Sequence, residues 1–289
     1  MAGLKQHVKQ QPLILIATGL LLIVLFFIFG RTTEPKKLAT SQVQPLATSF
    51  NINKFLDSSK TTLTPQQALY ISKLENNINR GDVPAQQLTS YNSLARFWKD
   101  TLRSFPAYAF YLSESAKLEN SEKKLTFAAQ LFLETLRAEH NEGKLAWETK
   151  TAIELFERAI ALNPEDQELK IGLGSCYIFG AGRNGDPQQT MKGIQELLSV
   201  VRKDSANLKA QFVLGVGGFV SAQYDKAIER FTKVVTAQPE NMEAVAFLAD
   251  TYAAKADKKN AIKWYNISKR LANNPAYSKE VDERIKMLK

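Results

Sequence analysis

The sequence predicts an all-α fold, a solenoid of antiparallel helix pairs preceded by one transmembrane helix. Three observations support this prediction. An uncharged apolar run occupies residues 13–30. Helical periodicity, without a convincing strand, extends from about residue 64 to the C-terminus. The later helices repeat the same small and large apolar residues at a nearly constant interval, which is typical of stacked structural repeats.

The composition is that of an ordinary globular protein: of 289 residues, 44% are hydrophobic and 23% charged. The single cysteine, Cys176, excludes an intrachain disulfide and a cysteine-based zinc site. Because Cys176 lies on an apolar helical stretch, we expect a buried structural thiol. The formal charge is +9, but basic and acidic residues alternate on nearly every helix, so no nucleic-acid-binding face is expected.

After a short N-terminal tail (residues 1–12), the run LILIATGLLLIVLFFIFG at residues 13–30 predicts a membrane-spanning helix. At about 1.5 Å per residue it spans roughly 27 Å, close to the thickness of a bilayer core. A cleaved signal peptide would have a shorter apolar region and a small-residue cleavage site, and a core helix would have a polar face. The run has neither feature, so we expect an uncleaved signal-anchor.

The orientation of this anchor in the membrane depends on the charged residues on either side of it. Lys5 and Lys9 precede the span, whereas Arg31, Lys36 and Lys37 follow it, so the flanking charges nearly balance. Long domains are translocated with little regard to such charges. We therefore expect the repeat domain outside the cytoplasm, in the periplasm, and keep a cytoplasm-facing membrane adaptor as the alternative.

Residues 31–62 are polar and carry two prolines, which predicts a linker. Thr64 and Pro65 then open a helix that Gly81 ends. Apolar residues at helical spacing predict further helices at 88–105, 107–118, 125–138 and 145–162. We interpret residues 63–144 as degenerate helical-hairpin repeats.

From residue 145 onward a repeated pattern appears. Each second helix of a pair has a small residue, a large apolar residue four positions later and a third residue three beyond. The spacing between successive second helices is 41, 34 and 34 residues. Each first helix has a leucine followed by a small residue, and proline follows three of the four pairs, at Pro164, Pro239 and Pro275. The repeat-defining residues are Ala152, Phe156 and Ala159; Pro164; Leu173, Gly174 and Tyr177; Gly193; Leu214 and Gly215; Ala227 and Phe231; Pro239; Leu248, Ala249 and Tyr252; and Ala261 and Tyr265.

A 34-residue period with these residues resembles the tetratricopeptide repeat. The resemblance extends over residues 145–275, and residues 276–289 resemble its polar C-terminal capping helix. The small residues let paired helices approach closely, and each pair needs a neighbour to cover its apolar face. The plan of one signal-anchor followed by repeats resembles the membrane-anchored tetratricopeptide proteins of the bacterial envelope. This implies a scaffold or assembly factor that binds protein partners.

In the resembled family the first helices line a concave groove. The corresponding candidate residues are Ile171, Ser175, Ile178 and Phe179; Lys209, Phe212, Val216, Phe219 and Val220; and Glu243 and Asp250. The middle helix is apolar on both faces, so something should cover it. Two occupants remain possible: a protein partner, or the earlier helices of this chain. Family members that bind acidic chaperone C-termini have Lys and Asn where this chain has Ile171 and Phe212, so that subtype is not expected.

No catalytic site or cofactor is expected. Residues 180–185 match G-x-G-x-x-G, but a helix, not a strand, is predicted before them, so we interpret them as an enlarged loop between paired helices. The only histidines are His7 and His140, too few for a histidine-based metal site. An enzyme or a nucleic-acid binder that uses the solenoid as a platform is the remaining alternative.

Overall fold

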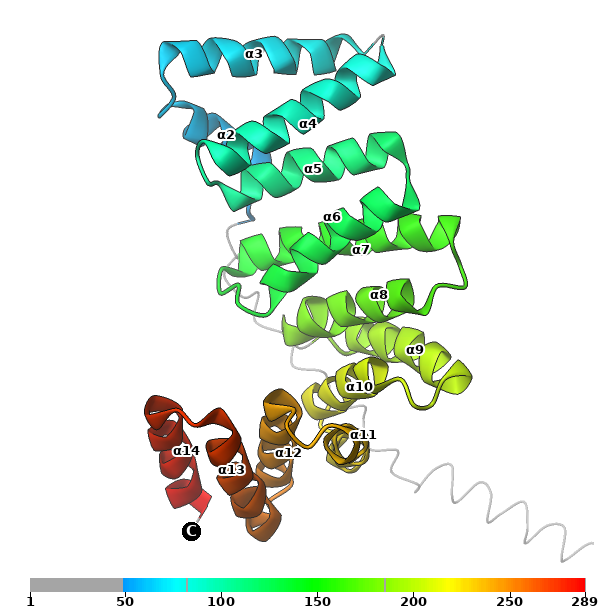
Figure 1. Cartoon of the computed structure of the whole chain (residues 1–289), viewed down its shortest axis with the longest axis vertical. Coiled ribbons are helices and arrows are strands. Elements are labelled where there is room, and N and C mark those ends of the chain that lie inside the picture. The colour runs from blue at the N-terminus through cyan, green and yellow to red at the C-terminus, as the bar shows by residue number, and fades with distance from the viewer. Residues whose placement is uncertain (1–48, 82, 185, 289) are drawn as a thin grey trace, which may run out of the picture. The chain divides into compact units, whose positions relative to one another are not determined.

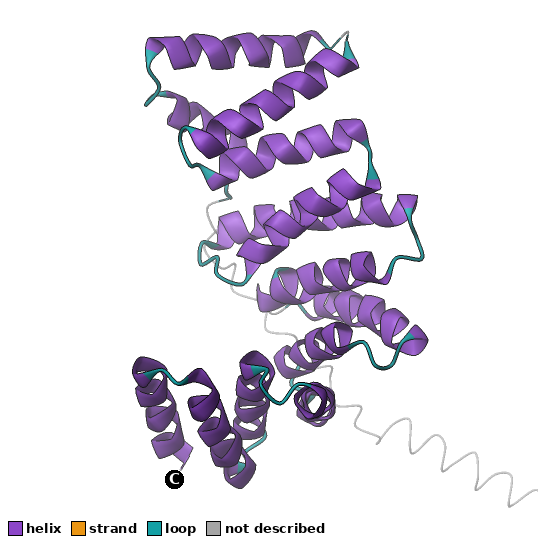
Figure 2. Ribbon diagram, viewed as in Figure 1, coloured by secondary structure: helices purple, strands orange, loops and turns teal. Residues whose placement is uncertain are grey.

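The computed structural model describes residues 49–81, 83–184 and 186–288. Over these residues the secondary structure is entirely helical, so the predicted all-α fold is confirmed for this part of the chain (Figure 2). The helices are α2 (Ile52–Lys60), α3 (Pro65–Arg80), α4 (Pro84–Asp100), α5 (Phe105–Glu119), α6 (Glu122–Leu136), α7 (Glu142–Leu162), α8 (Gln167–Phe179), η1 (Ala181–Asn184), α9 (Pro187–Lys203), α10 (Leu208–Val220), α11 (Tyr224–Ala237), α12 (Met242–Ala254), α13 (Lys258–Ala272) and α14 (Pro275–Leu288).

The N-terminal tail and the membrane span predicted at residues 13–30 lie outside the described residues. Within the described part of the chain, no helix is both long and apolar enough to cross a bilayer.

Consecutive helices pack as hairpins, and the hairpins stack in chain order (Figure 1). The pairs are α4 with α5, α6 with α7, α8 with α9, α10 with α11, and α12 with α13. At the end of the array, α14 buries Val281 and Ile285 in a cluster with Tyr265 of α13. The predicted solenoid of antiparallel pairs is therefore confirmed, and the residues of α14 cover its last apolar face.

The linker predicted for residues 31–62 is wrong in its last part, because Ile52–Lys60 form helix α2. The side chain of Asn51 accepts hydrogen bonds from two backbone N–H groups of the first turn, which caps the helix. Leu56 is buried in the first hydrophobic cluster of the array. A helix of about two turns shows too few periods for a sequence pattern to stand out, and its contact with α5 stabilises it.

Proline residues set several helix starts. At the start of α3, Thr64 and Gln67 form a reciprocal capping box, and Gly81 ends the helix with a φ of 72°, as predicted. The next helix begins at Pro84 rather than at residue 88, and it ends at Asp100 rather than at 105. Helix α5 starts at Phe105 with proline in its first turn, where the missing N–H costs nothing.

The boundary predicted between residues 144 and 145 is also corrected, since it cuts through the pair formed by α6 and α7. Helix α6 carries Ala128, Ala129 and Phe132 where the later first helices carry leucine, a small residue and usually an aromatic. All three residues are fully buried. The regular repeat thus begins at α6, with alanine in place of the leucine.

The small residues have the packing role that the pattern predicts. A Cβ atom on Gly215 of α10 would stand 2.5 Å from the ring of Phe231 on α11. Phe231 is itself fully buried, so the ring has no room to move. Cys176 of α8 is also completely buried, which confirms the predicted structural thiol, and burial raises its pKa well above the usual range.

Candidate partner-binding groove

A groove of about 580 Å³ lies where the first half of α12 meets the C-terminal ends of α8 and α10. Its floor is apolar and its rim carries both signs of charge. The lining residues are Arg137, Ile178, Phe179, Gly182, Arg183, Val216, Phe219, Val220, Glu243 and Phe247. Three successive first helices therefore contribute to one site, as expected for a groove on one face of a helical array.

Aromatic rings form one wall of this groove. The ring centroid of Phe247 lies 6.1 Å from that of Phe219, with the rings edge to face. On the side away from the groove, the ring of Phe247 stacks on that of Phe231, with 5.5 Å between centroids, and lies edge to face with that of Phe212 at 5.7 Å. Such contacts fix ring orientation. The wall is therefore preformed, and Phe219 and Val220 complete it at the C-terminal end of α10.

Six of the predicted groove residues line this site, and five do not. Those that line it are Ile178, Phe179, Val216, Phe219, Val220 and Glu243. Among them Ile178 and Val216 are almost completely buried and form the floor, whereas Val220 is 44% exposed.

The other five candidates lie elsewhere, and their assignment to the groove is corrected. Ile171 and Ser175 are buried between helices, and the Ser175 hydroxyl donates to the Ile171 carbonyl at 2.7 Å. Lys209 pairs with Glu168 at the opposite end of α10. Phe212 lies behind the aromatic wall, and Asp250 accepts hydrogen bonds from Tyr265 and Arg284 in the C-terminal part of the array. The helical pattern indicated the face of each helix on which these residues lie, but not where α12 lies relative to α8 and α10.

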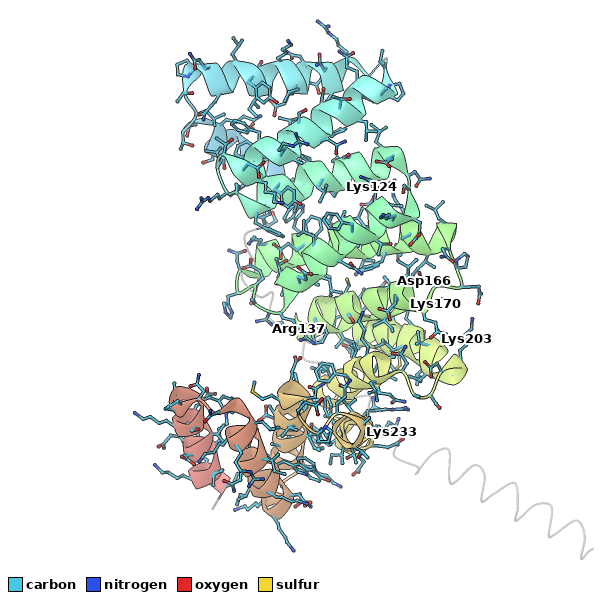
Figure 3. All side chains as sticks on the ribbon, viewed as in Figure 1. Lys124, Arg137, Asp166, Lys170, Lys203 and Lys233 are labelled. Carbon is cyan, nitrogen blue, oxygen red and sulfur yellow. The ribbon has the colours of Figure 1, made fainter. Side chains whose placement is uncertain are left out.

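Two arginines of the groove were missed by the sequence interpretation. Arg137 follows α6, and its guanidinium carbon lies 4.0 Å from the ring centroid of Phe179. An Arg137 nitrogen also pairs with a carboxylate oxygen of Glu243 at 2.5 Å, 106 residues away in the sequence. Figure 3 labels Arg137 near the ends of α6 and α8, close to α12. A side chain from an earlier pair thus crosses part of the groove.

Arg183 fixes the backbone that carries Arg137. Its Nη1 group donates to the carbonyl oxygens of Leu136, Arg137 and Glu139 at 2.9–3.4 Å. We call residues 137–141 the α6–α7 corner, and the connection between α8 and α9, described at residues 180–184 and 186, the α8–α9 corner. The two corners are therefore joined at the rim of the groove.

Unequal spacing within the pairs explains these corners. The small residue of the first helix precedes that of the second by 23 residues in α6–α7 (Ala129 to Ala152) and by 19 in α8–α9 (Gly174 to Gly193). The same spacing is 12 residues in the last two pairs. The α6–α7 and α8–α9 pairs thus have extra residues at the same end of the hairpin, in the connections and in the first turns of the second helices. This signal was available in the sequence and locates both corners.

A cluster of charged residues from α6, the α6–α7 corner and the start of α7 stabilises this corner. Lys144 pairs with Glu139 at 2.5 Å and approaches Glu148 at 3.5 Å, while the Thr135 hydroxyl donates to Glu148 at 3.0 Å. Burial raises the pKa of Glu148, although Lys144 and Thr135 oppose this shift. The pKa of Glu139 is lowered: burial alone would raise it, but hydrogen bonds from Lys144 and from backbone N–H groups outweigh burial.

The G-x-G-x-x-G motif belongs to the α8–α9 corner. The element before it is helix α8, so the strand that a dinucleotide fingerprint requires is not there. Gly180 is needed for packing, because a Cβ atom on it would stand 2.2 Å from the Thr149 hydroxyl. Across the described residues, no three His, Cys, Asp or Glu side chains are grouped so that they could hold a metal ion.

The stacked hairpins and the groove across their first helices define a helical-repeat protein. Residues 220–276, from the end of α10 into α14, match the tetratricopeptide repeat family. The match is to this stretch, which holds α11, α12 and α13.

Individual proteins show more distant similarities. A 103-residue stretch is 32% identical to the BBSome complex member BBS4 of Bos taurus; it covers 36% of this chain and only 18% of that protein. Among solved structures, MamA 41-end from Desulfovibrio magneticus RS-1 is 20% identical, with a TM-score of 0.48, over 64% of this chain and 95% of that one. YrrB, a TPR protein with an unusual peptide-binding site, is 15% identical, with a TM-score of 0.46, over 74% of this chain and 97% of that one.

Proposed function

We propose that the protein is a membrane-anchored interaction scaffold that docks an apolar segment of a protein partner in the groove between α8, α10 and α12. The observation that carries this proposal is the groove itself, which is lined by three successive first helices and has an aromatic wall formed by α10 and α12. Its volume of about 580 Å³ falls in the range of sites that enclose several side chains. Preformed aromatic walls are typical of interaction hot spots.

The contacts of the groove favour a partner over the chain's own earlier helices as its occupant. The earlier helices contribute Arg137 at the rim, and the space beside Phe219 and Val220 is still open with Arg137 in place. Val220 and Glu243 are 44% and 49% exposed. An apolar segment that covers Val220 would remove apolar surface from water, which stabilises the complex by about 25 cal/mol per Å².

Anchoring completes the proposed role. The run at residues 13–30 would hold the protein in the membrane, with the repeats outside the cytoplasm as a scaffold or assembly factor of the bacterial envelope. A reporter that is active on only one side of the membrane, fused after Lys289, tests this. Activity on the cytoplasmic side would favour the adaptor alternative instead.

Site-specific photocrosslinking tests the groove in cells that produce the full chain. A photoreactive amino acid at Val220 should form a discrete adduct with a partner. The matched control is position 162, where Leu162 on the second helix α7 is 46% exposed. Adding Phe219→Glu should abolish the Val220 adduct while circular dichroism remains unchanged. Equal adducts at both positions, or an adduct insensitive to Phe219→Glu, would exclude the groove as the docking site.

A further inference from the structure

The charged rim of the groove indicates what kind of segment it selects. We infer that Arg137 is the specificity-determining residue and that the partner segment combines apolar side chains with a carboxylate. That carboxylate replaces Glu243 as the partner of Arg137. This inference rests on the proposed function of the groove and adds the chemical class of its ligand.

The guanidinium of Arg137 is held in a position suited to a carboxylate. Its carbon lies 4.0 Å above the ring of Phe179 and 5.7 Å from the ring centroid of Phe212. Stacking on aromatic rings leaves the N–H groups at the edge of the guanidinium plane available for a planar anion. The α6–α7 corner beneath Arg137 is fixed by the three carbonyl contacts of Arg183. Arg137 is therefore the fixed member of the pair.

Glu243 is the member that can be displaced. It lies in the first turn of α12, where the helix dipole stabilises a carboxylate even without a cationic partner. Its side chain is 49% exposed, so water can replace Arg137 at little cost. An incoming carboxylate that is also attached to an apolar segment would gain the aromatic wall in addition to the ion pair.

The charges of the groove lining also favour a segment that carries a carboxylate. The groove lining contains two cations, Arg137 and Arg183, and one anion, Glu243. A segment bearing a carboxylate would bring the site to neutrality, whereas a cationic segment would place a third positive charge beside two arginines. Among apolar segments, the groove therefore favours those with an acidic residue.

A random-peptide display library provides the probe. It is panned on the full chain in detergent micelles, and peptides whose binding is lost with Phe219→Glu are kept. We expect these peptides to be apolar and enriched in Asp or Glu. Amidation of the acidic residue in the best peptide should weaken binding to the wild type on the order of fivefold. The amidated and acidic forms should bind Arg137→Met equally, because methionine has no positive charge to pair with the carboxylate.

Glu243→Gln distinguishes the two members of the pair. If Arg137 receives the ligand, this substitution removes a competitor and tightens binding of the acidic peptide a fewfold. Weaker binding to Glu243→Gln, together with selection of basic peptides, would show that Glu243 is the recognition group and overturn the inference.

The selection also separates this inference from the function on which it rests. Peptides that require Phe219 but show no preference for acidic residues would overturn the role of Arg137 and leave the groove as a docking site. Failure to select any peptide that depends on Phe219 would count against the docking site, and against this inference with it.

Discussion

The carbonyl oxygen of Gly174 lies 2.8 Å from the position that a Cβ atom on Gly193 would occupy. The contact is reciprocal, since a Cβ atom on Gly174 would stand 3.0 Å from the Gly193 carbonyl oxygen. Helices α8 and α9 therefore cross with their backbones in contact. Only glycine fits at this crossing, because the obstructing atoms belong to the backbone and cannot rotate away.

Replacing Gly193 by alanine should lower the free energy of unfolding by about 1–3 kcal/mol, since the added methyl group forces α8 and α9 apart. Urea denaturation of the full chain in detergent, followed by circular dichroism, measures the effect. Gly217→Ala is the control. Its Cβ would meet the side-chain ends of Ile178 and Ile194, and the gain in helix propensity, up to about 1 kcal/mol, offsets this contact. Equal losses in both variants would argue against a backbone contact at Gly193.

Replacing Arg183 by methionine should loosen the α6–α7 corner, because three carbonyl oxygens lose their donor. A charge-assisted hydrogen bond of this kind contributes about 1.5–3 kcal/mol. Hydrogen exchange should accelerate at residues 136–145 and remain unchanged in α12 and α13. Arg158→Met, which removes only an ion pair with Glu154 on the same helix, serves as the control. Unchanged exchange at the corner in Arg183→Met would contradict the anchoring role.

Cys176 should be inert in the folded protein. It is completely buried, and burial raises the pKa of its thiol, so very little thiolate exists at neutral pH. A water-soluble disulfide reagent should react with it only as the array unfolds in urea. Because the chain has one cysteine, the reaction reports on α8 alone. Rapid labelling of the folded chain would show that α8 opens independently of its neighbours.

Replacing Glu148 by glutamine should increase stability at neutral pH. Burial raises the pKa of Glu148 above its ordinary value of 4.5, so the folded chain binds this proton more tightly than the unfolded chain does. The resulting stabilisation of the wild type is complete below pH 4.5 and is lost as the pH rises through the folded-state pKa. Glutamine mimics the protonated form at every pH.

The two unfolding free energies should therefore agree below pH 4.5, with Glu148→Gln becoming the more stable as the pH rises to 7. Glu134→Gln, an exposed substitution on α6, should differ from the wild type by less than about 0.5 kcal/mol throughout. A destabilised Glu148→Gln at pH 7 would show that the ion pair with Lys144 outweighs burial.

The sequence was sufficient for the regular parts of the fold. Gly174, Gly215 and Ala249 repeat because each is packed against the second helix of its pair, and the same pair geometry requires a small residue each time it recurs. The helix starts at Thr64 and Pro65 were equally predictable, since capping is a local interaction. Features that depend on one turn or on the packing of one helix pair can thus be predicted from short stretches of sequence.

The groove could be predicted only in part. The apolar face of α10 indicated Val216 and Phe219, but the position of α12 relative to α8 depends on how rotations accumulate along the array. Arg137 reaches Glu243 from a distance of 106 residues, and no local pattern encodes that contact. Helix α2 was missed for a related reason, since its stability comes from packing on α5.

The two enlarged corners have a consequence for folding fidelity. An array of similar hairpins can pair out of register, because each helix finds a similar surface on more than one neighbour. The extra backbone at the α6–α7 and α8–α9 corners makes those two hairpins unlike the later ones. A slip by one hairpin would place Arg183 against the four-residue connection 101–104 between α4 and α5, or against a three-residue connection later in the array, without the carbonyl acceptors of the α6–α7 corner. The contact between the two corners therefore favours the native order of hairpins over a shifted one.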